Sequence, residues 1–147
     1  MQYFISGIIL YNGQKKDGTG DFISFGLSNG FPEFRFDVGS GPAVIKGAKE
    51  LELGKWHTVK LNRERADGSM IVNDEGPYVG NIYGSFQGLD LLYEPLLLGG
   101  VPDFSSIHRL SGHSKGFVGR FNFFSHSSHN CISHLILYEW EWGEVRT

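Results

Sequence analysis

The chain has 147 residues, which fits one domain of ordinary size, and 40% of them are hydrophobic, so it can bury a core. Its formal net charge of −3 argues against nucleic acid or an anionic membrane as a partner, and no apolar run approaches the roughly 20 residues that a membrane-spanning helix needs. Cys131 is the only cysteine, which excludes an internal disulfide.

The first predicted elements are short strands joined by tight turns. The apolar start of the chain, Met1–Leu10, predicts a strand rather than a signal peptide, because it has no basic residues and no clear small-residue cleavage site. Asp21–Leu27 predicts a second strand and Glu33–Val38 a third. Between them, Asn29-Gly30 is typical of a two-residue hairpin turn.

The third predicted strand alternates between apolar and charged residues. Such alternation is typical of a strand with one buried face and one solvated face. Its charged members are Glu33, Arg35 and Asp37. Glu33 and Asp37 have the spacing of two carboxylates on one strand face, as in a glycosidase pair, but Arg35 shares that face, so we interpret it as solvated surface.

The second half of the chain continues the same pattern of strands and turns. Short strands are predicted at Ala43–Ile45, Trp56–Leu61 and Ser69–Val72. The polar, glycine-rich segment Asp74–Gly88 predicts a long loop. Leu96–Leu98, before two glycines, predicts a fully buried strand.

Together these elements define an all-β fold. No segment has a sustained helical period, and no linker or internal repeat divides the chain, so the sequence indicates a single β-sandwich or barrel. The sequence also lacks a nucleophile elbow, a phosphate-binding glycine loop and a zinc-protease motif. We therefore expect a binding domain rather than an enzyme.

Five segments, in this order, resemble the laminin G-like family. The family's characteristic Gly-x-Trp-His-x-Val, Leu-Gly-Gly-x-Pro and Gly-Phe-x-Gly motifs all have counterparts. The matching segments are Asp21–Leu27, Phe34–Gly41, Gly54–Val59, Leu98–Pro102 and Gly116–Gly119. The resemblance implies an antiparallel, jelly-roll-like β-sandwich of the laminin G-like and concanavalin-like type.

The resemblance covers roughly Ile8 to Gly119, and the chain departs from the family at both ends. Family modules have further strands before the equivalent of Ile8, and they carry a cysteine where Arg120 stands here. We therefore expect a sandwich that is incomplete at both ends, with residues 1–119 a partial laminin G-like domain and residues 120–147 an unmatched tail of uncertain structure. An alternative transcript, a retained intron or a gene-model error would each account for this.

The resemblance also implies a calcium site at the rim of the sandwich. Carried over residue by residue, its side-chain ligands would be Asp21 and Asp90, and its backbone carbonyl ligands those of Val38 and Gly88. Calcium prefers such oxygen ligands. Without the resemblance, two aspartates at strand edges would be interpreted as turn formers.

Six basic residues form the candidate contacts for sulfated glycans, since the family often binds heparan sulfate through basic clusters. They are Lys15, Lys16, Lys46, Lys49, Arg63 and Arg65. Their scatter along a negatively charged chain favours ordinary surface charge as the simpler interpretation.

The resemblance implies a module of the extracellular matrix or basement membrane. Its expected partners are heparan sulfate, integrins and the glycans of cell-surface receptors such as dystroglycan. Two alternatives stay open at this stage. One is a lectin or glycan-processing enzyme on a similar sandwich, and the other is a non-functional truncated product that does not fold.

Overall fold

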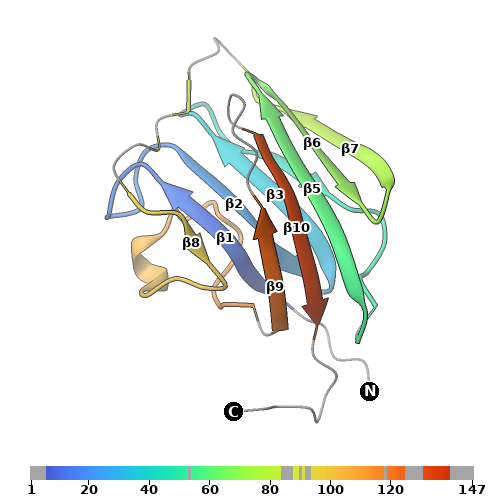
Figure 1. Ribbon diagram of the computed structural model, residues 1–147. Helices are drawn as coiled ribbons and strands as arrows, with labels where there is room; N and C mark the ends of the chain where they lie inside the picture. Colours follow the sequence, from blue (N-terminus) through green and yellow to red (C-terminus); the bar gives the residue numbers. More distant parts are fainter. Residues whose placement is uncertain are drawn as a thin grey trace.

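The predicted strands assemble into two five-stranded antiparallel sheets that pack face to face (Figure 1). The all-β sandwich predicted from the sequence is therefore confirmed. This computed structural model describes residues 6–52, 54–83, 88–89, 91, 94–117, 119–124 and 131–139, the last two ranges as backbone strands. In this part of the chain, no helix is both long and apolar enough to span a membrane.

The first sheet, here called sheet A, has the strand order β4-β3-β2-β1-β8, and the second, sheet B, has the order β7-β6-β5-β10-β9. The strands of sheet A are β1 (Gly7–Gly13), β2 (Phe22–Ser28), β3 (Phe31–Asp37), β4 (Ala43–Lys46) and β8 (Leu97–Leu98). The strands of sheet B are β5 (Trp56–Glu64), β6 (Asp67–Val72), β7 (Glu75–Asn81), β9 (Gly119–Phe124) and β10 (Cys131–Glu139). A short 3₁₀ helix, η1 (Phe104–Ser106), lies between β8 and β9.

Two-residue turns fix the register of neighbouring strands. Asn29 and Gly30 have φ values of 52° and 85°, so they form the predicted hairpin turn and pair Ser28 with Phe31. A second turn of this kind, at Asn73 and Asp74, joins β6 to β7. The prediction of a continuous loop from Asp74 was therefore wrong for the residues of β7.

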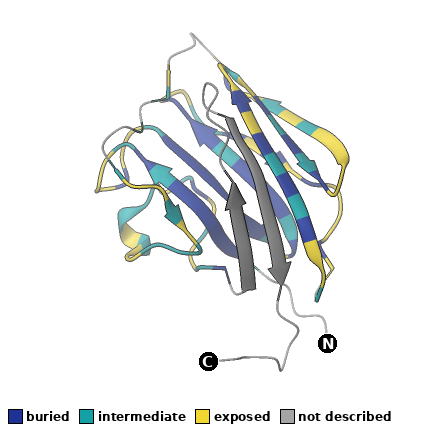
Figure 2. Ribbon diagram, viewed as in Figure 1, coloured by how far each residue is buried: buried dark blue, intermediate teal, exposed yellow. Residues whose placement is uncertain are grey.

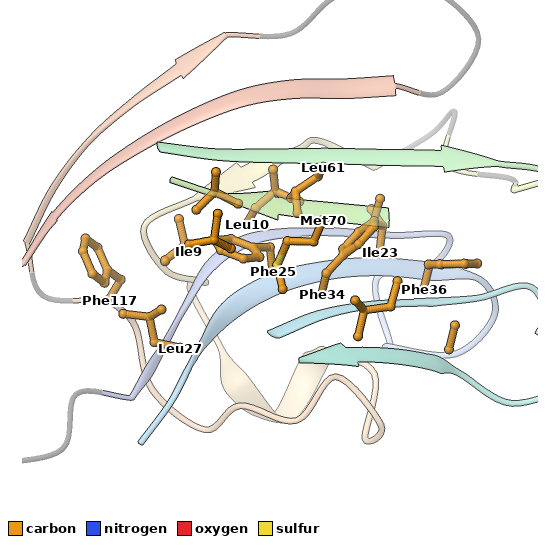
Figure 3. Packing of buried hydrophobic residues seen from close by; sticks show 14 of the residues in the cluster. Ile9, Leu10, Ile23, Phe25, Leu27, Phe34, Phe36, Leu61, Met70 and Phe117 are labelled. Atoms are coloured by element: carbon orange, nitrogen blue, oxygen red, sulfur yellow. The ribbon is translucent and has the colours of Figure 1, made fainter. Parts of the chain in front are cut away.

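The main core lies between the two sheets, where apolar side chains from both inner faces meet (Figure 3). Phe25 and Phe34 of sheet A and Leu61 and Met70 of sheet B are almost completely buried. Along β5, buried residues alternate with intermediate or exposed ones, as the sequence predicts (Figure 2). Where β6 comes close to sheet A, Gly68 leaves room for the ring of Phe36.

The outer face of sheet A is covered as well, by the chain that follows β8. A second cluster forms there around Ile8, Tyr11 and Phe22. The residues that pack onto this cluster from outside β1 and β2 are Leu97, Val101, Phe104, Ile107 and Leu110. The ring of His108 stacks on Phe22 with 4.5 Å between ring centroids. The segment from residue 99 to residue 117 is called the covering segment below.

The prediction of a solvated face on β3 was wrong, because the covering segment buries that face. Glu33 is only 1% exposed and Asp37 only 4%. Glu33 forms an ion pair with Arg35, and the ammonium group of Lys46 lies 3.6 Å from its second oxygen. Arg35 Nη1 in turn donates a hydrogen bond of 3.0 Å to the carbonyl of Leu110. Because these charged groups have partners, this face of the sheet can be buried although it is polar.

The later part of the chain differs from the predictions in two further respects. The predicted buried strand Leu96–Leu98 is shorter, and Leu98 is 38% exposed at the edge of sheet A. Within residues 120–147, the structure places most of β9 and all of β10, and β10 pairs with both β5 and β9. The domain boundary at residue 119 stays a prediction.

We expect Gly68→Ala to destabilise the domain by about 1–3 kcal/mol, because overpacking a well-filled core forces side chains and backbone to shift. A Cβ at Gly68 would lie 2.4 Å from a ring carbon of Phe36. Gly88→Ala is the control, since no atom of another described residue lies within 4 Å of the added Cβ there. Chemical denaturation measures both; equal midpoints for the two variants would contradict the close approach of the sheets.

The covering segment should also make stability depend on pH. Burial lowers the pKa of His113, opposed by Glu33, and burial lowers the pKa of His108, opposed by Asp37. The unfolded chain therefore takes up these protons first, so stability is fully present above about pH 6.5 and falls as the pH decreases below it.

The effect is at most about 1.4 kcal/mol per pH unit for each histidine. The double variant His108→Gln/His113→Gln should lose less stability between pH 7 and pH 5 than the parent chain. Urea denaturation at several pH values measures this difference. If the variant has the same pH dependence as the parent, the two histidines do not contribute.

Candidate functional site

Two of the four predicted calcium ligands lie side by side at one end of sheet A. The last pair of residues in register on β2 and β3 is Phe22 and Asp37. The next residue outward on each strand is Asp21 and Val38, so the antiparallel register places Asp21 opposite Val38. Asp21 is half-buried and Val38 is buried. This end of the sandwich is called the Asp21 rim below.

The loop after Val38 is shaped by the carboxylate of Asp37. Oδ1 of Asp37 accepts hydrogen bonds from the backbone N–H of Gly39, at 2.7 Å, and of Gly41, at 3.2 Å. Both glycines have positive φ values, of 110° and 107°, which favour glycine. This role of Asp37 was not predicted from the sequence. Its signal is an aspartate followed by glycines two and four residues later, a pattern typical of an Asx turn.

The backbone of Asp21 is held by Gln14 from the end of β1. The backbone N–H of Gln14 donates to the carbonyl of Asp21 at 2.8 Å, and Gln14 Oε1 accepts from the N–H of Asp21 at 2.9 Å. The backbone of Asp21 is therefore fixed on both sides, by Gln14 and by the β2–β3 register. A fixed backbone suits a binding role because less conformational entropy is lost on binding.

The segment that leads toward the other two predicted ligands also reaches this rim. Ser40 Oγ donates a hydrogen bond of 2.8 Å to the carbonyl of Tyr83, directly after β7. Farther along, Gly88 is exposed, and Leu89 and Leu91 pack against the main core. Asp90 lies outside the described residues. The structure thus brings Asp21 and Val38 together, and the roles of Gly88 and Asp90 stay predictions.

Arg63 lies near the rim but inside the domain. It is 1% exposed, and its guanidinium carbon lies 5.6 Å from the centre of the Phe36 ring, within the range of a cation–π contact. Burial lowers the pKa of Arg63, while the negative charge of Asp21 raises it. Two consequences follow. The glycan hypothesis requires Arg63 at the surface, but the side chain is buried. In addition, the guanidinium of Arg63 would repel a cation bound at Asp21.

The other five basic residues divide between the two ends of the sandwich. Lys15, Lys16 and Arg65 are exposed near the Asp21 rim, the first two next to Gln14 and the third in the turn after β5. Lys46 and Lys49 lie at the opposite end. Their ammonium groups lie 3.6 Å from a carboxylate oxygen of Glu33 and 3.0 Å from one of Glu75.

The oxygen-rich character of the rim fits a hard cation better than a soft one. Among the described residues, no group of three or more His, Cys, Asp or Glu side chains is close enough to hold a metal ion. A calcium site with two carboxylates and two carbonyls does not need such a group. Asp21 and the backbone after β3 would supply one carboxylate and one carbonyl to it.

A two-sheet, jelly-roll-type sandwich with a polar rim is the class of domain that this fold and site define. The profile of the family described as "Laminin G domain" matches residues 5–129. The chain therefore belongs to the laminin G domain family.

Relatives identified by sequence include a basement membrane proteoglycan and a laminin subunit. The chain is 52% identical over 119 residues to the basement membrane-specific heparan sulfate proteoglycan core protein of Mus musculus, covering 77% of this chain and 3% of that protein. It is 35% identical over 113 residues to pikachurin of Homo sapiens, covering 77% of this chain and 11% of that protein. For the human laminin subunit alpha-1, the identity is 31% over 121 residues, covering 78% of this chain and 4% of that protein.

A solved structure supports the same fold. Domains LG4-5 of the mouse laminin alpha1 chain superpose with a TM-score of 0.60 at 23% identity, covering 90% of this chain and 30% of that one. At this identity the likeness concerns the fold alone. This chain thus spans only a small part of the length of the proteins that it resembles.

The role of Asp37 at the rim can be tested directly. We expect Asp37→Ala to destabilise the domain by about 1–3 kcal/mol, because the N–H groups of Gly39 and Gly41 lose their acceptor. Asp37→Asn keeps an acceptor oxygen of the same shape and should lose clearly less. Thermal and urea denaturation of the three proteins give the comparison. Equal losses for both variants would show that the carboxylate does not act through these hydrogen bonds.

Proposed function

We propose that this domain is a calcium-assisted recognition module of the extracellular matrix, which binds acidic glycans at the Asp21 rim. The expected glycans are heparan sulfate and the glycans of cell-surface receptors of the dystroglycan type; integrins are further candidate partners. The proposal goes beyond the family membership, because membership of the laminin G domain family does not by itself define a ligand for this chain.

The observation that carries the proposal is the position of Asp21 opposite Val38. It supports a site in which the carboxylate of Asp21 and the carbonyl of Val38 bind one calcium ion, together with the predicted ligands Gly88 and Asp90. Calcium takes six to eight oxygen ligands, so a set of this size leaves positions for water. A carboxylate or sulfate of a partner glycan would displace that water and bind the ion directly.

The charges around the rim suit an acidic partner. Lys15, Lys16 and Arg65 are exposed at this end of the sandwich and supply donors for sulfate and carboxylate groups. Since these side chains are exposed, their contribution should decrease at high ionic strength. The repulsion from Arg63 argues for weak calcium binding, with a dissociation constant of roughly 0.1–1 mM, as in extracellular modules.

The structural surroundings of Glu33 and Asp37, the two carboxylates with the spacing of a glycosidase pair, favour binding over catalysis. Glu33 and Asp37 are buried, and their carboxylates are engaged, by Arg35 and by the backbone of the loop after β3, respectively. A substrate has no access to them. For this reason we propose a binding module rather than the glycan-processing enzyme that the sequence leaves open.

Calcium titration by calorimetry tests the proposal. We expect a binding heat for the parent chain that disappears in Asp21→Ala, because the variant loses the carboxylate at the rim. Glu64→Gln is the matched control, since Glu64 is an exposed carboxylate on the outward-facing side of β5 and should leave calcium binding unchanged. Calcium should also raise the melting temperature of the parent chain but not of Asp21→Ala.

A second titration, with a heparin-derived oligosaccharide, tests the ligand class. Its affinity should decrease when calcium is removed, when the salt concentration increases and in the Lys15→Ala/Lys16→Ala variant. Calcium binding that persists in Asp21→Ala would exclude this assignment of the site.

A further inference from the structure

At the end of the sandwich opposite the Asp21 rim, the structure contains a cavity of about 320 Å³. One wall is formed by the connection between β4 and β5, and the other by the β6–β7 turn and β7. Trp56, the first residue of β5, also lines the cavity. We call this cavity the Trp56 pocket. Trp56 and Arg63 lie seven residues apart on β5, about 23 Å at the rise of an extended strand, so the pocket is separate from the rim.

Ion pairs hold the walls of the Trp56 pocket in place. Lys49 Nζ lies 3.0 Å from Glu75 Oε1, which ties the β4–β5 connection to β7. Lys55 Nζ lies 2.5 Å from Glu52 Oε2 within the connection itself. Each exposed pair is worth little by itself. Together they place charged groups of both signs around the opening.

The base of the Trp56 pocket is a fixed hydrogen-bond network around His57, which is buried. Its Nδ1 lies 2.9 Å from Asn73 Nδ2, and its Nε2 lies 2.7 Å from the carbonyl of Glu52. Asn73 Oδ1 accepts from the N–H of Thr58 at 2.9 Å, so the amide must donate to Nδ1. With the amide donating to Nδ1, Nε2 is the nitrogen that donates to the carbonyl of Glu52. The base is therefore held by hydrogen bonds on both sides of the ring.

Trp56 gives the pocket an apolar surface. The side chain is 50% exposed, an unusual position for the largest aromatic residue, and Tyr78 lines the opposite wall half-buried. Buried Leu51 and Val72 complete the apolar part of the lining. An aromatic surface beside several hydrogen-bonding groups suits a ligand with one apolar face and many polar groups.

The charge balance selects among such ligands. Three carboxylates line the pocket, those of Glu50, Glu52 and Glu75, against the two ammonium groups of Lys49 and Lys55. Because both ammonium groups pair with carboxylates, a sulfated glycan would meet no unpaired positive charge among the described residues of the lining. It would also be repelled by the excess of negative charge. A cationic ligand would have to displace the lysines.

We propose that the Trp56 pocket is a second glycan-binding site, which takes an uncharged sugar unit and does not depend on calcium. The indole of Trp56 packs against the C–H face of a pyranose ring, and its hydroxyl groups exchange hydrogen bonds with the carboxylates and ammonium groups of the walls. The volume lies at the lower end of the range for small-ligand sites, enough for about one or two sugar units. This inference is independent of the calcium-dependent function proposed for the Asp21 rim.

The test uses the whole chain on an array of uncharged oligosaccharides, in the presence of EDTA, followed by titration of the best-binding oligosaccharide. In ¹⁵N-labelled protein, the indole N–H resonance of Trp56 should shift during the titration. Trp56→Ala should weaken binding by about tenfold or more, the equivalent of 1.4 kcal/mol, whereas Trp56→Tyr keeps an aromatic surface and should lose only a few-fold. Glu75→Gln is a second test variant, to be used if Trp56→Ala does not fold. It should reduce the affinity for the oligosaccharide several-fold.

Asp21→Ala and Val79→Ala are the controls and should leave this binding unchanged. Val79 is an exposed residue of β7 that does not line the Trp56 pocket. The proposal is overturned if no uncharged oligosaccharide binds, or if Trp56→Ala binds as the parent does. It is also overturned if EDTA or Asp21→Ala abolishes the binding, which would assign it to the rim. Because EDTA is present throughout, a failure of the calcium site does not affect this result.

Discussion

The register between β2 and β3 determines most of what this domain presents to its surroundings. A turn of two residues with positive φ, at Asn29 and Gly30, permits one alignment of these strands. That alignment directs Phe25 and Phe34 into the core, and it ends with Asp21 beside Val38 at the rim. A slip of one residue would turn every side chain of a strand to the other face and separate the two rim residues. The core and the candidate site therefore depend on the same hairpin.

A second constraint comes from the covering segment, which makes both faces of sheet A internal. One face is apolar in the usual way, but the other contains Glu33, Arg35 and Asp37. Their charges are tolerated because each has a partner: Glu33 binds Arg35, Arg35 binds the carbonyl of Leu110, and Asp37 accepts from the loop that follows it. Such a face gains little stability from its ion pairs, since the desolvation of buried charges offsets their attraction. The polar face does favour one position of the covering segment, because a shifted segment would separate Arg35 from the carbonyl of Leu110.

These two constraints explain how far the sequence was informative. Local signals predicted the early strands and the hairpin turn correctly, because they depend on alternation and on turn residues close together in the chain. The burial of Glu33 was not predictable from alternation, since the residues that cover it lie some eighty positions later. β7 escaped prediction because glycine, proline and asparagine interrupt it, and an edge strand can tolerate them. Asp21 and Val38 were placed at the site by family resemblance, and the register supports their proximity. The Trp56 pocket had no sequence signal, because its two walls are separate segments.

The strand order has a consequence for how the domain is made. In sheet B, β5 and β6 form a local hairpin, but β5 acquires its other neighbour only from β10, in which Ile132 pairs with Leu61. In sheet A, β1 likewise acquires its second neighbour only from β8, in which Leu98 pairs with Leu10. Such non-local pairings fold slowly, because the loop between the partners must be closed before the contacts form. During synthesis, β5 and β1 therefore emerge with unpaired backbone edges that persist until the late strands have been translated. Unpaired edges of this kind can pair with another copy of the chain, so over that interval the nascent domain is most exposed to edge-to-edge association.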